Sequence, residues 1–567
     1  MSHTLRNTSS RFVLLATFCS VLMVGGCSRS SDPITVDEQV EVLGEDFKSI
    51  FADQEPVAHA ISLHEAMARG ILYNLDHRVS VMEGMIAKGE VDLALLEVLP
   101  SLNAQAKYTG RDEDVSYTPR SLATGNPSLP NSVFDEKSKT TARLGVNWNA
   151  IDAGIAYAEA KSLSDKARVA EERRRKVVHN IIQDVRYAYW RAASAQILLE
   201  RIDALIESGK AEVALLDREV NKWQTPYTKM PRYKQQVRLL ENMQELVSLK
   251  ESLVTAKVEL ASLINLSPND NIQLNVDESV IFNQDSIPSL DLDPAAMELV
   301  ALMIRPEIRE NILMKRIGAR NVNTTALSAI PGIGAALGYH YDGNNYLGNN
   351  DWNEVSFSIT QNLLKLFSLP GRMKHVKNKE RLIEMRRRAL LVAVMSQVHL
   401  SRHRLDLAQD NFRVHHKLAA VTQKISSATE KMKSMSKADH LENEMDALLN
   451  RAKLHLSYAE YQNAYGRVLT SIGMDPLPKD MPVTDLVSMT GMIAKRADKI
   501  SPKIFDKLLM LVKKRGLDAL SKQSGHVVMA SVSAADVVSV TQIAPAAGVP
   551  IVQEATPKPS TVSSYND

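Results

Sequence analysis

The spacing of apolar positions along the chain predicts long helices. Between residues 155 and 208 there is neither proline nor glycine, and apolar residues recur at alternating spacings of three and four over four heptads. These residues are Val178, Ile181, Val185, Ala188, Ala192, Ala195, Leu199, Ile202 and Ile206. Continued to about residue 224, such a helix has roughly 70 residues and a length on the order of 100 Å. It must pack along other helices or span a gap, because it exceeds an ordinary globular core.

The same apolar spacing predicts helices before and after this long helix. An earlier helical pattern runs from Ile61 to Leu99 and ends at Pro100. After the long helix, Pro226 and Pro231 break the chain, and a returning helix keeps the same apolar rhythm up to the segment N-L-S-P at residues 265–268. The chain is polar and acidic before the first helix, so residues 27–60 are predicted to be a tether.

Between the first two helices the period changes to two, which predicts a pair of strands. Apolar and polar residues alternate at about residues 101–108 and again at about 141–149. A loop rich in Ser, Pro, Asn and Asp separates the two runs. The strands therefore run out and back across one loop, and the helices attached to them lie on the same side.

The whole arrangement occurs twice. Pro331 stands 231 residues after Pro100, and at the same offset four alternating apolar positions match in kind. Strands are expected again at about residues 332–341 and 354–362, followed by helices at about 374–426 and 438–472. The two copies, each helix, strand, loop, strand, helix, turn, helix, span residues 61–270 and 295–478, with a linker at 271–294.

Composition excludes several classes of protein. Charged residues make up 24% and aromatic residues 5%, with a formal net charge of +2, so nothing favours a nucleic-acid partner. The 14 histidines show no zinc-site spacing. There is no G-x-S-x-G, phosphate loop or paired-carboxylate signature. We therefore expect neither an enzyme nor a metal or other cofactor.

The N-terminus predicts export and a lipid anchor. The two cysteines, Cys19 and Cys27, both lie in the first thirty residues. An apolar stretch at residues 12–24 has the length of a signal-peptide core and is too short for a permanent span. It ends in V-G-G-C, which resembles a bacterial lipobox and implies a signal peptide at residues 1–26 with lipid on Cys27. The alternative is an ordinary signal peptide that happens to contain a cysteine.

The strands are the candidates for crossing a membrane. Beyond residue 27 no apolar run reaches about 18 residues, so a crossing would have to use strands. Each strand has an apolar face and aromatic residues near its ends, although a soluble sheet packed on one face is the alternative. Four strands cannot close a barrel, so several chains must share one. Polar residues expected on the lumen side are Asn103, Gln105, Asn147, Ser356 and Thr360.

Several segments resemble the TolC-like outer-membrane efflux protein family, lipoprotein type. They are I-S-L-H-E-A-M-A-R-G-I-L-Y-N from Ile61, L-P-S-L from Leu99, A-Y-W-R-A-A from Ala188 and R-P-E-I from Arg305. The likeness covers about residues 61–478 and depends mainly on the order of elements. It implies a mainly α fold with a membrane β-barrel: a homotrimer of four strands per chain whose long coiled-coil helices form a periplasmic tunnel.

The resemblance also implies a function. The chain would be a passive exit duct in the outer membrane, part of a tripartite efflux or type I secretion system, in contact with outer-membrane lipid. Its partners would be a periplasmic adaptor protein and an inner-membrane transporter of the RND or ABC type. The alternative is a coiled-coil adaptor or scaffold lipoprotein without a channel. The cargo stays open among drugs, metal ions, proteins and polysaccharides.

The turns between paired helices depart from the family pattern, which commonly carries a glycine there. Here the two stretches, residues 222–233 and 432–439, contain none. Residues expected to contact an adaptor at this tip are Lys222, Trp223, Lys229, Lys433, Lys437 and Asp439. The alternative is that they are solvated helix ends. Residues 479–567 are expected to be largely disordered, with a short basic helix near residues 504–514.

Replacing Cys27 with Ser tests the anchor. We expect the variant to lose incorporation of labelled palmitate and to be sorted less efficiently to the outer membrane, because the thiol is the site of lipidation. Trimers that still assemble should conduct normally, since one acyl chain gives only marginal attachment. Unchanged palmitate labelling, or loss of conductance in correctly inserted trimers, would contradict this expectation.

Overall fold

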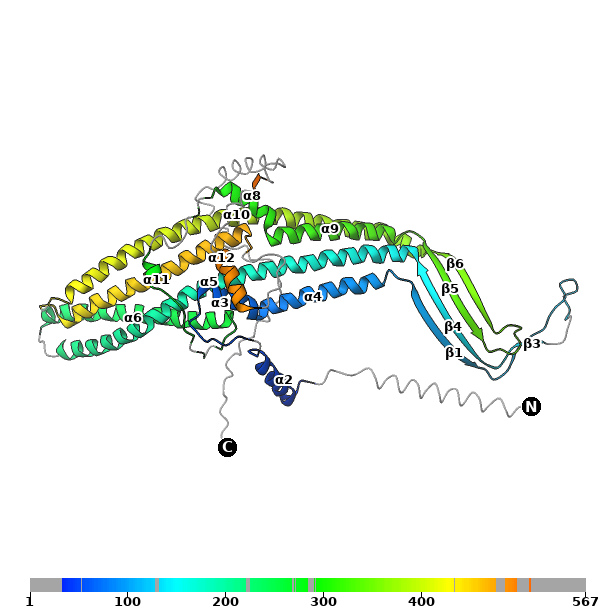
Figure 1. Cartoon of the computed structure of the whole chain (residues 1–567), viewed down its shortest axis with the longest axis horizontal. Coiled ribbons are helices and arrows are strands. Elements are labelled where there is room, and N and C mark those ends of the chain that lie inside the picture. Colours follow the sequence, from blue (N-terminus) through cyan, green and yellow to red (C-terminus); the bar gives the residue numbers. More distant parts are fainter. Residues whose placement is uncertain are drawn as a thin grey trace, which may run out of the picture.

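The molecule is elongated, with a β-sheet at one end and a tip of paired helices at the other (Figure 1). Near the middle of the molecule, the short helices α3 (Leu63–Tyr73), α8 (Pro294–Ile304) and α12 (Leu486–Arg496) pack around the long helices, and we call this region the belt. The computed structural model describes residues 33–52, 54–127, 132–220, 225–267, 270, 272–283, 290, 292–432, 434–475, 485–496 and 509–510.

Two very long helices run from the sheet to the tip. Helix α5 (Ala150–Val220) has 71 residues and α10 (Leu363–Thr429) has 67, so each is roughly 100 Å long at the usual rise. Helix α6 (Pro226–Leu263) returns from the tip along α5, and α11 (Lys437–Ile472) returns along α10. The predicted duplicated helix-strand-strand-helix-helix fold is therefore confirmed.

Shorter helices complete each copy. In the first copy α3 (Leu63–Tyr73) and α4 (Leu75–Leu96) precede the strands, and in the second copy α8 (Pro294–Ile304) and α9 (Pro306–Leu327) do so. The single helix predicted between Ile61 and Leu99 is wrong, because Asn74 is extended and its side-chain oxygen accepts hydrogen bonds from the first backbone amides of α4. Arg305 is extended at the matching position because Pro306 follows it.

Two proline positions also differ from the prediction. Pro231 is the sixth residue of α6 rather than a break, although without an amide hydrogen it cannot donate to the carbonyl oxygen of Tyr227. Helix α10 begins at Leu363, well before the expected residue 374, and passes through Pro370. The side chain of Asn362 caps this helix by accepting hydrogen bonds from two backbone amides.

Four strands form one antiparallel sheet in the order β1-β4-β5-β6. They are β1 (Ser101–Gly110), β4 (Ser138–Asn149), β5 (Gly332–Asp342) and β6 (Asp351–Thr360). Strands β4 and β5, which come from different copies, pair in the centre of the sheet. The loop of the first copy contains a small hairpin of β2 (Val115–Tyr117) and β3 (Ser132–Asp135), which the sequence pattern did not predict.

The core has two parts. One fills the space between α5, α6 and α11 toward the tip, where Leu198, Ile202, Leu246, Leu253 and Met445 are fully buried. The other lies in the belt. Its aromatic side chains are Tyr189, Trp190, Phe412, Tyr458, Tyr461 and Tyr465. Most of the heptad positions predicted on α5 are buried in these two clusters, so the periodicity identified the packed face correctly.

The segment predicted as a linker, residues 271–294, packs into the belt. Ile61 forms a parallel bridge with Leu274, and the Tyr189 hydroxyl donates to the carbonyl oxygens of Ile61 (3.1 Å) and Asn275 (2.9 Å). Leu274 and Ile281, which lies in α7 (Ser279–Phe282), are buried. The segment therefore contributes to the core that joins the two copies.

Elements near both termini are helical as well. Within the predicted tether, α2 (Val36–Ser49) forms a helix without a buried residue. Within the region predicted as largely disordered, α12 (Leu486–Arg496) packs on α3 and buries Leu486, Met489 and Ile493. Most of the predicted basic helix near residues 504–514 lies outside the described residues, as does Cys27.

Gly473 provides a test of the packing between copies. It ends α11 with a φ of +82°, and a Cβ there would lie 3.0 Å from Cα of Arg305. We expect Gly473→Ala to destabilise the fold by at least about 1–2 kcal/mol, because the left-handed conformation disfavours a side chain. Guanidinium unfolding followed by helical circular dichroism measures this.

The matched control is Gly89→Ala in α4. A Cβ at Gly89 meets no atom within 4 Å. Removing a glycine from a helix interior should stabilise the fold by roughly 0.5–1 kcal/mol. Equal unfolding midpoints for the two variants would show that the end of α11 is not under this constraint.

Candidate functional site

The four-stranded sheet has two faces of opposite character. Because side chains alternate along a strand, the register places each residue on one face. In one row Gln105 pairs with Arg143, Arg143 with His340, and His340 with Trp352 across all four strands. In the next row Ala104 pairs with Leu144, and Leu144 with Tyr339. We call the first the polar face and the second the apolar face.

The apolar face is exposed. No other described part of the chain covers it, and Phe357 is 82% accessible to solvent. Large apolar side chains that are exposed on this face are Leu102, Tyr108, Leu144, Val146, Trp148, Ile333, Leu337, Tyr339, Tyr341, Val355, Phe357 and Ile359. An exposed apolar patch of this kind marks a surface that contacts lipid or another protein. None of the described helices combines the length and apolar composition needed to cross a bilayer.

The polar face contains the residues that the sequence suggested for a lumen. The strand register brings Asn103, Gln105, Asn147, Ser356 and Thr360 onto this one face. It also brings Lys107, Arg143, His340 and Trp352 there, which the sequence-based selection missed. Alternation from Asn147 would have found Arg143. The residues His340 and Trp352 required the register between strands of the second copy.

Both edges of the sheet are open in the described chain. Strand β1 pairs only with β4, and β6 pairs only with β5. Their outward backbone groups therefore have no partner strand. An open edge with an exposed apolar face is a template for pairing with another chain.

Charged side chains fix the loops at the far end of the sheet. The ammonium of Lys139 lies 2.8 Å from the carboxylate of Asp135 and 2.9 Å from that of Asp342, and Arg111 lies 2.7 Å from Asp135. The side chain of Asn344 donates to the carbonyl oxygen of Phe134 (2.8 Å). These contacts join the loop of the first copy to that of the second.

At the opposite end, two helical turns form the tip (Figure 1). Lys437 is exposed and its ammonium lies 3.2 Å from the carboxylate of Glu212. Ser436 caps α11 by accepting a hydrogen bond from the amide of Asp439, whose carboxylate accepts hydrogen bonds from the Ser436 hydroxyl and from Gln235 of α6 (2.6 Å). Lys229 lies in the first turn of α6 and is partly exposed. Lys222, Trp223 and Lys433 lie outside the described residues.

Asp439 begins a polar ladder between α6 and α11. The next contacts are Arg238 to Glu442 (3.1 Å) and Asn242 to Asp446 (2.9 Å). Burial raises the pKa of Glu442, although Arg238 opposes this shift. The ladder joins the helix pair of the first copy to that of the second near the tip.

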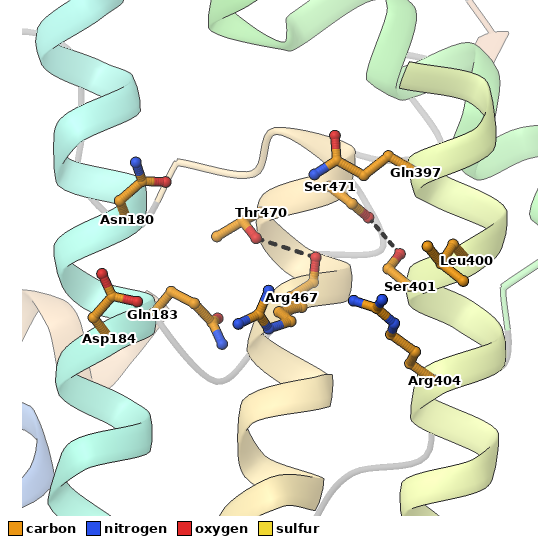
Figure 2. Close-up of a pocket in the computed structure, with 10 residues that line it drawn as sticks. All are labelled: Asn180, Gln183, Asp184, Gln397, Leu400, Ser401, Arg404, Arg467, Thr470 and Ser471. Atoms are coloured by element: carbon orange, nitrogen blue, oxygen red, sulfur yellow. Dashed lines mark hydrogen bonds between the residues drawn. The ribbon is translucent and has the colours of Figure 1, made fainter. Parts of the chain in front are cut away.

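A polar hollow of about 160 Å³ lies between α5, α10 and α11 (Figure 2). The hydroxyl oxygens of Ser401 and Ser471 are 2.8 Å apart. Burial raises the pKa of Asp184, and Arg467 opposes the shift. None of its ten lining residues is a histidine or a cysteine.

Titratable groups of the belt form ion-pair networks. The Glu278 carboxylate, just before α7, lies 3.0 Å from Nε2 of buried His455 and also pairs with Arg451 of α11. The hydrogen bond from His455, aided by Arg451, lowers the pKa of Glu278 from 4.5 to about 2. Within the described residues, no group of three or more His, Cys, Asp or Glu side chains is placed to hold a metal ion.

The fold is similar to solved outer-membrane channels. With CusC, in a study of its transmembrane channel formation, the TM-score is 0.55 at 12% identity over 75% of this chain and 96% of that chain. With the open state of the MtrE outer-membrane channel of Neisseria gonorrhoeae it is 0.56 at 14% identity over 72% and 88%. With the outer membrane protein VceC of Vibrio cholerae it is 0.53 at 14% identity over 72% and 96%.

No protein-family model and no curated protein matches the sequence. The structural likeness nevertheless extends over nearly the full length of those channels. The chain therefore has the fold of the TolC-like outer-membrane channels, and the resemblance expected from the sequence is confirmed for the fold.

The ion pairs of Glu278 predict that the stability of the folded protein depends on pH. Its folded-state pKa is lowered, so its contribution to stability is present above pH 4.5 and is lost as the pH falls from 4.5 toward 2. We expect Glu278→Gln to unfold at lower denaturant than the unmodified protein above pH 4.5, and the difference to shrink below that value. Unfolding midpoints measured across this range check it.

Glu90→Gln, on an exposed part of α4, is the control. It should leave the midpoint unchanged at every pH, because Glu90 has no ion pair in the described part of the chain. A destabilisation by Glu278→Gln that is the same at all pH values would contradict the assignment to the ionised carboxylate.

Proposed function

We propose that the protein is a passive exit duct of the bacterial outer membrane, formed by three copies of the chain. The observation that carries this proposal is the sheet: four long strands with one exposed apolar face and two open edges. Water cannot satisfy open edges within a bilayer, so a single copy cannot reside there. Joining β6 of one copy to β1 of the next closes a sheet of twelve strands without an edge.

The dimensions of the sheet support a membrane location. Its strands have ten to twelve residues. Ten residues extend over roughly 33 Å, and tilted as in closed membrane sheets they cross an apolar band about 25 Å high. The apolar face would then contact lipid, and the polar face with Asn103, Gln105, Asn147, Ser356 and Thr360 would line the lumen.

The helices offer surfaces for the same assembly. On α6, Leu240, Val247 and Val254 are exposed at a strict spacing of seven, and α10 repeats this spacing. The exposed heptad positions of α10 are Leu400, Leu407, Val414 and Val421. Such rows are the seams by which helices pair with other helices. They would join neighbouring copies and extend the duct into the periplasm, on the side where lipidated Cys27 would hold the chain.

The tip would be the surface for partners. It lies at the end of the molecule opposite the sheet and carries the turns with Lys229, Lys437 and Asp439. A periplasmic adaptor would bind there and couple the duct to an inner-membrane transporter, which would supply the energy because the chain has no phosphate-binding loop. Such an assembly serves tripartite efflux or type I secretion.

The test is assembly and conduction. Outer-membrane extracts should contain heat-modifiable trimers that conduct ions in planar bilayers. Phe357→Asp should prevent their insertion, because it places a charge on the lipid-facing side at a position that is 82% exposed. A monomer that is soluble without detergent and does not conduct would overturn the proposal in favour of a scaffold.

Ser356→Asp is the matched control. It introduces an aspartate at the neighbouring position of β6, where the side chain lies on the polar face. Trimers should form and conduct, since water would surround the new carboxylate. If both Asp variants insert equally well, the two faces have been assigned wrongly.

A further inference from the structure

A shallow hollow of about 240 Å³ lies on the polar face of the sheet. All four strands contribute to it. The charged and aromatic side chains of the polar face that line it are Lys107, Arg143, His340, Asp342 and Trp352. It is therefore built from both copies of the duplicated fold and lies in the half of the sheet farther from the helices.

Two cations in the hollow are not neutralised. Lys107 and Arg143 have no ion pair or hydrogen bond with another side chain in the described residues. The carboxylate of Asp342 is already held by Lys139 at 2.9 Å. The other carboxylate on this face, Glu354, lies 3.3 Å from Nε2 of His340. It is paired with Gly338, two residues along the strand from the pair of His340 with Trp352.

Glycines allow the side chains of His340 and Arg143 to lie along the sheet. A Cβ at Gly338 would be 2.9 Å from Nε2 of His340, and one at Gly145 would be 3.6 Å from Nε of Arg143. The His340 ring stacks on Trp352 with ring centres 5.3 Å apart and planes within 4°. The stacked indole and imidazole rings therefore line the hollow beside the side chains of Lys107 and Arg143.

We infer that this cluster, Lys107 with Arg143, makes the duct favour anions over cations at its outer end. The inference rests on the proposed function, since it requires the polar face to line a lumen. Three copies would place six unpaired cations around one opening. Rings of Arg and Lys side chains select anions in pores, and charges within about 8 Å of a passing ion act on it even at physiological salt.

Reversal potentials test this inference. Wild-type trimers and Lys107→Gln/Arg143→Gln trimers are compared in planar bilayers under a KCl gradient, which gives the permeability ratio of chloride to potassium. We expect the ratio to fall by about two-fold or more in the neutral variant, as removal of nearby fixed charge requires. Lys107→Arg/Arg143→Lys keeps the charge and should keep the wild-type ratio.

Gln105→Glu provides an independent variant. Gln105 pairs directly with Arg143 across β1 and β4, so a carboxylate of the same shape would neutralise the guanidinium without removing it. The ratio should fall here too. Assembly of every variant is checked by its heat-modifiable trimer.

The outcomes separate the two proposals. Wild-type protein that opens no channel overturns the duct and this inference together. A conducting wild type whose permeability ratio is the same in the neutral and Gln105→Glu variants overturns only the inference. A ratio that falls equally in the charge-keeping variant overturns it as well, because side-chain shape rather than charge would then be responsible.

Discussion

The two open edges of the sheet determine where this chain can reside. Within the residues that the structure describes, strands β1 and β6 each leave a row of backbone amide and carbonyl groups without a partner strand. In water these groups bind solvent, but in hydrocarbon each unsatisfied group costs several kcal/mol. The sheet can therefore enter a bilayer only when other copies complete it. In the proposed duct, membrane insertion, oligomerisation and formation of the lumen are one event, in which the apolar face comes to lie against lipid.

The belt makes this arrangement possible by fixing the two copies relative to each other. Strand β4 leads into α5, and α9 leads into β5. The two strands can pair in the observed register only if α5 and α9 are held in one relative position. Arg175 of α5 pairs with Glu172 and with Asp475 beyond α11 (2.7 Å), and His179 lies 2.8 Å from the same Asp475. Because these charges are largely buried, losing one partner would leave an uncompensated charge. The network thus specifies one relation between α5 and the end of α11.

Local patterns predicted most elements because they report local geometry. Alternation at residues 101–108 and heptads in α5 identify a strand and a helix by which side is buried, whatever lies opposite. Proline was a weaker guide. Pro231 and Pro370 lie inside helices that continue in spite of the lost hydrogen bond. The segment 271–294 has no periodic pattern, because its apolar residues Leu274 and Ile281 pack singly against distant helices.

The duplicated order of elements, the great length of α5 and the polar and apolar faces of each strand follow from the sequence. Which residues of different strands become neighbours depends on the tertiary contacts. Arg143 and His340 are almost two hundred residues apart, and their pairing depends on the register of β4 and β5. The same holds for Gln235 and Asp439 at the tip. Periodicity is set by each segment alone, whereas register is set by the contacts of all segments together, so the cationic hollow could not be read from the sequence.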